Sequence, residues 1–222
     1  MKSVANNSKT IKSVDFSTIC PKRRCGTECV YCYVKSARDI GFNAKKEHDY
    51  VPYNGEILRL SQKIVDNLNK VGGIRFFSFG DYMPEHDQDI NQALEDCLSR
   101  DLKAKAITKV PEFVIKYGNH PAISVINVSI DNIGDGVNHE LACELRIAFP
   151  KAKIRCVVLN DSDVEAMESI TDVFTFNHAS NIVKHGYKLY KKADLIEWNK
   201  KLDGRVCCVT GHCISCDLKC GA

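Results

Sequence analysis

The chain has 222 residues, of which 44% are apolar and 27% charged, and its formal net charge is +3. This length is sufficient for one sizeable core, and the composition is that of a globular protein rather than a disordered one. No segment approaches the roughly 18 apolar residues of a membrane-spanning helix, so no membrane partner is expected. The net charge is too small to indicate a nucleic-acid partner by itself, because phosphate binding depends on clustered lysine and arginine.

The amino-terminal segment, residues 1–10, is polar and lacks the apolar core of a secretory signal. We therefore expect a cytoplasmic location, in which thiols stay reduced and structural disulfides are rare. The chain nevertheless has twelve cysteines. In a reducing compartment such cysteines are expected to bind a metal or to pack in the core as small apolar residues. The second role is predicted for Cys97, Cys143 and Cys156, which lie in apolar helical or extended segments.

Extended and helical patterns alternate along the first half of the chain. Strands are predicted where β-branched and aromatic residues cluster, and helices where apolar residues recur every three or four positions. Asn54 is a candidate N-cap, Gly72 and Gly73 form a stop signal, and Pro111 is favourable at a first helical position. The predicted strands span residues 13–19, 74–79 and 102–110, and the predicted helices span residues 54–71, 87–100 and 111–117.

The second half of the chain continues the alternation. Strands are predicted over residues 123–130, 153–159 and 172–176. Helices are predicted over residues 137–149, from a cap at Asp161 or Ser162, and over residues 190–202. Six β/α units in succession predict an α/β fold with a parallel sheet. Such units can curl into an open barrel with the helices outside, but a doubly wound sheet has the same local pattern, and periodicity does not separate the two.

Three cysteines lie close together after the first predicted strand, at Cys25, Cys29 and Cys32. An iron–sulfur electron carrier uses four cysteine ligands for each cluster, so three thiolates leave a four-iron cluster with one open position. Structural zinc is the alternative for this segment. Zinc sites favour two pairs of closely spaced ligands or a mixture of cysteine and histidine, whereas no histidine follows Cys32 before His48.

The Cys-x3-Cys-x2-Cys spacing, with the aromatic Tyr31 before the last cysteine, resembles the cluster motif of the radical S-adenosylmethionine (radical SAM) superfamily. The resemblance implies that Cys25, Cys29 and Cys32 hold a catalytic [4Fe-4S] cluster and that S-adenosyl-L-methionine binds the open iron, with Tyr31 beside the adenine. It also implies a partial (β/α)6 barrel over residues 1–204. The chain further resembles small radical-SAM-like proteins encoded by phages, through residues 74–81 and the pair Thr108 and Lys109.

Polar residues follow each of the other predicted strands. In barrels and open α/β sheets, ligands bind at the carboxyl ends of the strands, so these residues are candidate site residues. They are Gly80 and Asp81, Thr108 and Lys109, Ser129 with Asp131 and Asn132, Asn160 and Asp161, and Asn177 and His178.

The resemblance assigns cofactor-binding roles to five of these residues. Gly80 and Asp81 are similar to the family element that contacts the amino group of S-adenosylmethionine, although Phe79 replaces a glycine and the acid is shorter. A substrate contact and a turn before Pro84 are the alternatives for Asp81. Lys109 is expected to pair with the carboxylate of the cofactor or with a substrate anion, or else to be a solvated charge at a strand end. Ser129 and Asp131 correspond to ribose-binding positions, and the family's glycine-rich fifth-strand element is not visible over residues 155–160.

A second group of cysteines lies near the carboxyl terminus, and we expect residues 205–222 to form a short metal-binding extension. Four thiolates satisfy either a closed iron–sulfur cluster or tetrahedral zinc, so a second [4Fe-4S] cluster and zinc are both open. Cys207 and His212 are additional candidate ligands. The four expected metal ligands are Cys208, Cys213, Cys216 and Cys220.

The resemblance implies a radical SAM enzyme that forms a 5′-deoxyadenosyl radical and abstracts hydrogen from a substrate. Flavodoxin or ferredoxin is the expected type of one-electron reductant, and the substrate is a small molecule, a peptide or a nucleic acid. Two alternatives remain open. One is a zinc-stabilised nucleic-acid-binding module that uses the basic run 22–24, and the other is an iron–sulfur electron carrier.

Overall fold

The computed structural model describes residues 4–6, 12–17, 50–78, 80–133, 137–176, 183 and 186–207 of the chain. These residues form a seven-stranded sheet whose spatial order is the order of the strands in the sequence. The first pair is antiparallel, and the second to the seventh strands are parallel. The strands are β1 (Val4–Asn6), β2 (Lys12–Val14), β3 (Ile74–Phe76), β4 (Ala104–Thr108), β5 (Ile123–Ile130), β6 (Ala152–Val158) and β7 (Val173–Phe176).

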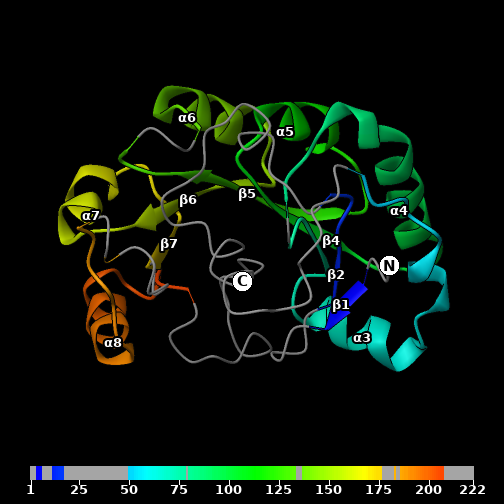
Figure 1. Ribbon diagram of the computed structural model, residues 1–222, viewed down its shortest axis with the longest axis horizontal. Helices are drawn as coiled ribbons and strands as arrows, with labels where there is room; N and C mark the ends of the chain where they lie inside the picture. Colours follow the sequence, from blue (N-terminus) through cyan, green and yellow to red (C-terminus); the bar gives the residue numbers. More distant parts are fainter. Residues whose placement is uncertain are drawn as a thin grey trace.

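The described helices form an outer arc around this sheet (Figure 1). Because strand order follows sequence order, every parallel connection advances in the same direction, and the sheet curves inside the arc. The α/β prediction is confirmed, and the arrangement is compatible with a partial barrel. The helical segments are η1 (Glu56–Arg59), α3 (Gln62–Lys70), η2 (Pro84–His86), α4 (Asp87–Ser99), α5 (Pro111–Tyr117), α6 (His139–Ala148), α7 (Asp161–Met167) and α8 (Lys192–Lys201).

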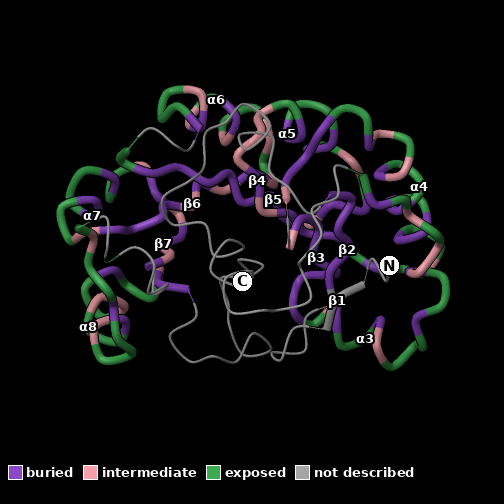
Figure 2. Tube along the Cα trace, in the orientation of Figure 1, coloured by how far each residue is buried: buried purple, intermediate pink, exposed green. Residues whose placement is uncertain are grey.

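One face of the sheet is apolar and packs against the helices. A row of buried residues on this face crosses five strands, because each is the register partner of the next. Figure 2 shows buried residues along the strands and exposed residues on the outer turns of the helices. Burial of this continuous apolar layer is the main stabilising contribution to the fold. The row consists of Val14, Phe76, Ala106, Ile126 and Ala152.

The prediction of one continuous helix over residues 54–71 is wrong. The chain forms the short 3-10 helix η1, becomes extended at Leu60 (ψ 136°), and then begins α3. Arg100 explains the interruption, because its guanidinium donates to the carbonyl oxygens of Leu58 and Leu60 at 3.0 and 2.7 Å. These carbonyls would otherwise accept hydrogen bonds within the helix. The predicted stop at Gly72 and Gly73 is confirmed, and both have positive φ.

Three other boundaries differ from the predictions. The strand β1 was not predicted, because three residues are too short to show a period. It pairs with β2 through Val4 and Val14. The N-cap of α7 is Asn160 rather than Asp161 or Ser162, and the Asp163 carboxylate accepts from the Asn160 amide at 2.9 Å. The predicted strand over 13–19 is described only to residue 17, where regular pairing ends at Val14.

The remaining predicted elements are present within a few residues of their expected ends. The helix α5 and the strand β5 have the predicted bounds. Among the described helices, none has the length and apolar content that crossing a bilayer would require.

Replacement of Gly73 tests how closely the connection between α3 and β3 packs against the neighbouring backbone. Its φ is +112°, and a Cβ atom there would lie 2.1 Å from the carbonyl oxygen of Lys103, which accepts the Ile74 amide. We expect Gly73→Ala to lower the free energy of unfolding by on the order of 3 kcal/mol, through backbone strain and the displaced strand contact. Urea denaturation followed by circular dichroism measures this change.

The matched control is Gly204→Ala. Gly204 also has positive φ, at +82°, but a Cβ atom there would meet nothing within 4 Å. Only the backbone cost of about 1 kcal/mol is expected for this variant. Equal losses for the two variants would contradict a steric role for the close contact at Gly73.

Candidate functional site at the carboxyl ends of the strands

The predicted cysteine ligands lie outside the described residues. These are Cys25, Cys29 and Cys32 with the neighbouring Tyr31, and Cys208, Cys213, Cys216 and Cys220. Asn177 and His178 also lie outside the described part of the chain. The structure places the other candidate residues, which follow β3, β4, β5 and β6.

Asp81 connects the ends of β3 and β4. The chain leaves β3 through Phe77 and Gly80, which both have positive φ, and this brings the Asp81 carboxylate under the end of β4. Its Oδ1 accepts hydrogen bonds from the Tyr82 amide at 2.8 Å and from the Thr108 hydroxyl. Its Oδ2 accepts from the Lys109 amide at 2.7 Å. The carboxylate therefore organises its own turn and also joins two neighbouring strand ends.

The burial of Asp81 gives it an unusual acidity. Removal from water raises the pKa of this carboxyl from its ordinary value of 3.8 to about 6, even though hydrogen bonds from Thr108 and from the amides of Lys109 and Tyr82 favour the charged form. The positive charge of Lys109 acts in the same direction as these hydrogen bonds. Asp81 therefore exchanges a proton close to neutral pH, within the range that is useful for acid–base chemistry.

Lys109 extends this connection from β4 to β5. Its Nζ lies 3.4 Å from Oδ2 of Asp131, and the two side chains are 14% and 0% exposed. The prediction of a solvated strand-end charge is therefore wrong for Lys109. Asp131 also accepts from the Ile133 amide at 3.2 Å, and its carbonyl oxygen lies 3.1 Å from Nε2 of His139. A continuous set of polar contacts thus joins the ends of β3, β4 and β5.

Ser129 lies within β5 and contacts β6. Its side chain is buried, and its Oγ accepts a hydrogen bond from Nη1 of Arg155 at 3.2 Å. Its carbonyl oxygen accepts from the Val137 amide at 3.1 Å. Sequence reasoning did not select Arg155 as a site residue. The alternation of Arg155 with the buried Ile154 and Cys156 on β6 was the available signal that its side chain belongs to the opposite face of the sheet.

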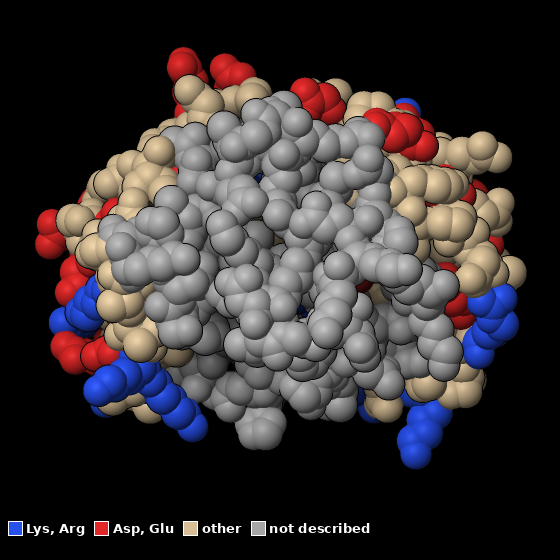
Figure 3. Space-filling view, in the orientation of Figure 1, with Lys and Arg blue, Asp and Glu red and all other residues tan. Residues whose placement is uncertain are grey.

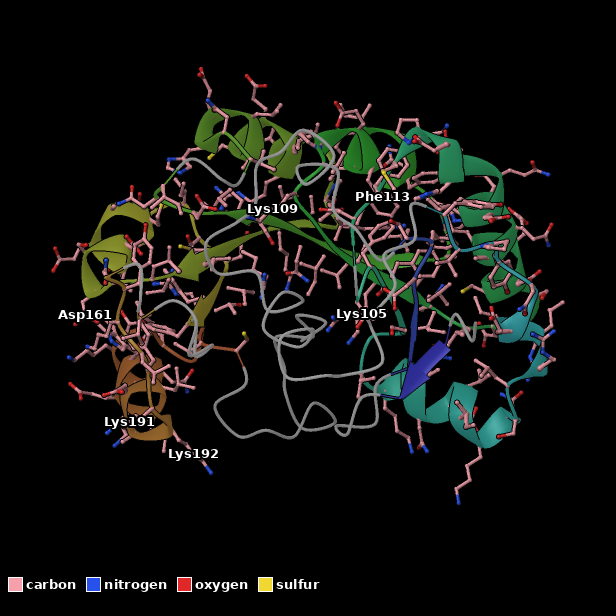
Figure 4. The ribbon with its side chains drawn as sticks, viewed as in Figure 1. Lys105, Lys109, Phe113, Asp161, Lys191 and Lys192 are labelled. Atoms are coloured by element: carbon pink, nitrogen blue, oxygen red, sulfur yellow. The ribbon has the colours of Figure 1, made fainter. Side chains whose placement is uncertain are left out.

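Asp161 lies away from the strand-end group. Its carboxylate accepts from Nζ of Lys188 at 2.8 Å and from the Tyr190 hydroxyl at 2.9 Å. Burial acts to raise the pKa of Asp161, but these hydrogen bonds and the charge of Lys188 outweigh it and lower the pKa. Figure 4 shows Asp161 at one end of the arc, with Lys191 and Lys192. Asp161 therefore holds the segment that precedes α8.

The cysteines predicted to pack in the core do so. Cys97 and Cys156 are buried, and Cys143 is partly buried against the core. Burial raises the pKa of the Cys97 and Cys156 thiols to about 12, so both remain protonated at neutral pH. Within the described ranges, no group of three or more histidine, cysteine, aspartate or glutamate side chains is suited to hold a metal ion.

No protein-family model matches this chain, and a search of curated proteins found no match. The described site consists of a buried carboxylate with a raised pKa, an ion pair beside it, and a serine linked to an arginine. These groups come from four consecutive parallel strands or their ends, the arrangement in which α/β proteins place ligands.

The pKa of Asp81 predicts a specific pH dependence of stability. Because this pKa is higher in the folded than in the unfolded chain, the folded chain binds more protons between about pH 4 and pH 6. The contribution of Asp81 to the free energy of unfolding should therefore fall by about 2 kcal/mol as the pH rises from 4 to 7. Urea denaturation of the wild type and Asp81→Asn at several pH values measures this difference, and the variant should lack the fall.

Asp161→Asn is the control with the opposite sign. The pKa of Asp161 is lowered in the folded chain, so its stabilising contribution is present at neutral pH and is lost on acidification. The advantage of the wild type over Asp161→Asn should therefore grow with pH, whereas its advantage over Asp81→Asn should shrink. Parallel pH curves for the two variants would contradict the assigned environments.

Proposed function

We propose that the chain is a radical SAM enzyme in which Cys25, Cys29 and Cys32 hold a [4Fe-4S] cluster and S-adenosyl-L-methionine binds beside it. The observation that carries this proposal is the position at which the cysteine-bearing segment joins the described structure. The segment leaves after Ser17, beyond the carboxyl end of β2, and the described chain resumes at Tyr50. The Val51 amide donates to the carbonyl oxygen of Phe16 at 2.7 Å, so the two ends of the segment meet at that strand end.

The same edge of the sheet carries the other residues that the proposal requires. The strands β2, β3, β4 and β5 are consecutive parallel neighbours, so their carboxyl ends lie side by side. Asp81 and Lys109 follow two of these strands, and Asp131 follows a third. The cysteine motif is therefore connected to the edge at which the candidate cofactor-binding residues are held together.

When bound, a cluster with three cysteine ligands supplies an electron for reductive cleavage of S-adenosyl-L-methionine to methionine and a 5′-deoxyadenosyl radical that abstracts hydrogen. The residues of the chain supply position and charge for this chemistry. Lys109 presents an ammonium group at the edge, suited to a carboxylate. Asp131 presents carboxylate oxygens suited to ribose hydroxyls, and Tyr31 an aromatic ring suited to adenine.

Asp81 has a positioning role in this proposal. Its two oxygens already accept from the amides of Tyr82 and Lys109 and from the Thr108 hydroxyl. It thereby sets the direction in which Lys109 leaves β4. Gly80, with φ +75°, permits the turn that brings Asp81 to this position.

The carboxyl-terminal segment joins the structure at the other end of the sheet. The Cys207 amide donates to the carbonyl oxygen of Phe174 at 2.9 Å, and its Sγ lies 2.9 Å from Oγ1 of Thr175 on β7. We propose that Cys208, Cys213, Cys216 and Cys220 bind a second [4Fe-4S] cluster or zinc. A flavodoxin or ferredoxin is the proposed type of electron donor.

Replacement of one motif cysteine tests the proposed function. The protein is purified without oxygen, its iron, sulfide and zinc are measured, and it is incubated with S-adenosyl-L-methionine and dithionite. We expect the wild type to form 5′-deoxyadenosine and Cys29→Ala to form none above the level without protein, because a two-cysteine site does not retain the cluster. Chromatography of the products gives the amount of 5′-deoxyadenosine.

Cys143→Ala is the matched control, since Cys143 is partly buried on α6 and has no proposed ligand role. It should retain iron content and 5′-deoxyadenosine formation. A colourless wild type that contains zinc alone would overturn the proposal in favour of a zinc-stabilised module. A wild type with iron and sulfide that forms no 5′-deoxyadenosine would overturn it in favour of an electron carrier.

A further inference from the structure

The inner face of the sheet is rich in polar residues, although Val125 and Ile107 also belong to it, whereas parallel sheets usually bury apolar residues on both faces. On β2, β3 and β4 the register partners Ser13, Arg75 and Lys105 form a row on the side opposite Val14 and Phe76. A second pair of strands continues this face, because Asn127 is the partner of Lys153, and Ser129 is the partner of Arg155. The polar part of the inner face consists of these seven residues together with Asp15, Lys109 and Asp131, which follow in alternation on the same strands or just beyond them.

Positive charge predominates on the described part of the inner face. Five of its side chains are cationic and two are anionic, namely Asp15 and Asp131. Two of the cationic residues are buried, with Arg75 8% and Lys105 1% exposed, the other three are partly buried, and both anionic residues are buried. Removing charges from water is costly unless opposite charges or hydrogen bonds compensate. The face as a whole still carries more positive than negative side chains, and this excess favours the presence of an anion. The five cationic residues are Arg75, Lys105, Lys109, Lys153 and Arg155.

Three of the five have contacts that account for their position, and the first of them is Arg75, whose Nη2 donates to Oγ of Ser78 at 2.9 Å. The Nζ of Lys105 donates to the carbonyl oxygen of Val71 at 2.7 Å, where a cation stabilises the carboxyl end of α3. Lys109 pairs with Asp131. Figure 4 shows Lys105 and Lys109 on the inner side of the sheet, whereas Phe113 lies on the side of the helices.

For Arg155 and Lys153, contacts with described residues do not compensate the positive charge in this way. Within the described residues, Arg155 makes one hydrogen bond, from Nη1 to Ser129, and its Nε is buried without a hydrogen-bond partner. The Lys153 side chain is partly buried and forms no hydrogen bond or ion pair with any described residue. Their backbone positions alternate on β6, so both side chains project from the same face, and Asn127 and Ser129 lie directly beside them on β5.

We propose that Lys153 and Arg155, together with Asn127 and Ser129, bind the phosphate group of a small-molecule substrate. This rests on the proposed function, because it names the substrate class of that enzyme. The four side chains offer ammonium, guanidinium, amide and hydroxyl donors. A phosphate group carries between one and two negative charges at neutral pH and three acceptor oxygens. The donors therefore exceed what a single planar carboxylate, with one charge, would require.

The location of these residues favours a small molecule over a nucleic acid. Polynucleotide backbones are bound by lysine and arginine side chains that extend from an exposed surface. Asn127 and Ser129 are 0% and 2% exposed, and Lys153 and Arg155 belong to the inner face rather than to the helical exterior. The space-filling view in Figure 3 shows described lysine and arginine side chains at the lower left and lower right of the outline.

The test is calorimetric titration of the anaerobically purified, cluster-containing protein with inorganic pyrophosphate, in the absence of S-adenosyl-L-methionine. We expect saturable binding to the wild type that weakens as salt increases, because the contacts are ionic. The double variant Lys153→Gln, Arg155→Gln should bind at least about tenfold more weakly, since two charge-assisted contacts are lost. The single variant Arg155→Lys should lie between the two, because it keeps the charge but loses the planar pair of donors.

The double variant Lys192→Gln, Lys200→Gln is the matched control, because it removes the same charge from exposed positions on α8. It should bind pyrophosphate as the wild type does. Circular dichroism shows whether each variant is folded. If the Lys153→Gln, Arg155→Gln variant is unfolded, the affinity of Arg155→Lys for pyrophosphate decides the outcome. The proposal would be overturned if the wild type did not bind pyrophosphate, or if the control variant lost as much affinity as the double variant. It would also be overturned if the double variant did not fold and Arg155→Lys bound pyrophosphate as tightly as the wild type.

A titration with citrate separates phosphate from carboxylate chemistry. Citrate binding as tight as that of pyrophosphate, and equally sensitive to Arg155→Lys, would overturn the phosphate assignment in favour of a polycarboxylate. Binding to a short DNA strand that exceeds pyrophosphate binding would overturn the small-molecule assignment. Pyrophosphate binding is measured without cofactor cleavage, so a protein that binds pyrophosphate but forms no 5′-deoxyadenosine would contradict the proposed function and leave the anion site supported.

Discussion

The two faces of the parallel sheet differ in chemistry, and the rest of the structure depends on this difference. One face presents an apolar layer that includes Phe76, Ile126 and Ile154, and helices cover it. The other presents Arg75, Lys105, Asn127 and Arg155. Apolar area is removed from water on only one side by the helices, so the described helices form a single outer arc, and the polar face curves inward. A polar interior that is held by rigid strands is suited to bind a charged ligand.

The carboxyl edge of the sheet is organised by a buried carboxylate. Asp81 is desolvated, which opposes its charge, but it accepts hydrogen bonds from groups on two strand ends. Its raised pKa indicates that the cost of burial exceeds the stabilisation that these hydrogen bonds give to the charged form. The molecule carries this cost at the point where β3 and β4 must be aligned, and the ion pair of Lys109 and Asp131 continues the alignment to β5. Such a trade of stability for alignment is common at functional sites.

Sequence patterns correctly predicted the helices and strands whose ends are set by residues within or next to the element. The helix α5 begins at a proline and ends before Gly118, and the strand β5 is a long β-branched run, so both were predicted with correct bounds. The segment 54–71 has a helical period throughout, yet Arg100 binds two of its carbonyl oxygens and divides it. Arg100 is about forty residues away in the sequence, and no local pattern contains this contact. The cap at Asn160 was missed because several adjacent polar residues are equally suitable for an N-cap.

The sequence by itself determined the alternation of strands and helices, the spacing of the cysteines and the polar character of the strand exits. These properties depend on neighbouring residues and can be read from periodicity. Only the tertiary structure decided that Lys109 pairs with Asp131, that Asp81 joins two strand ends, and that Arg155 and Lys153 share the inner face with Asn127 and Ser129. Each of these relations depends on which strands are neighbours and on their register, and register is set by packing of the whole apolar layer rather than by any local segment.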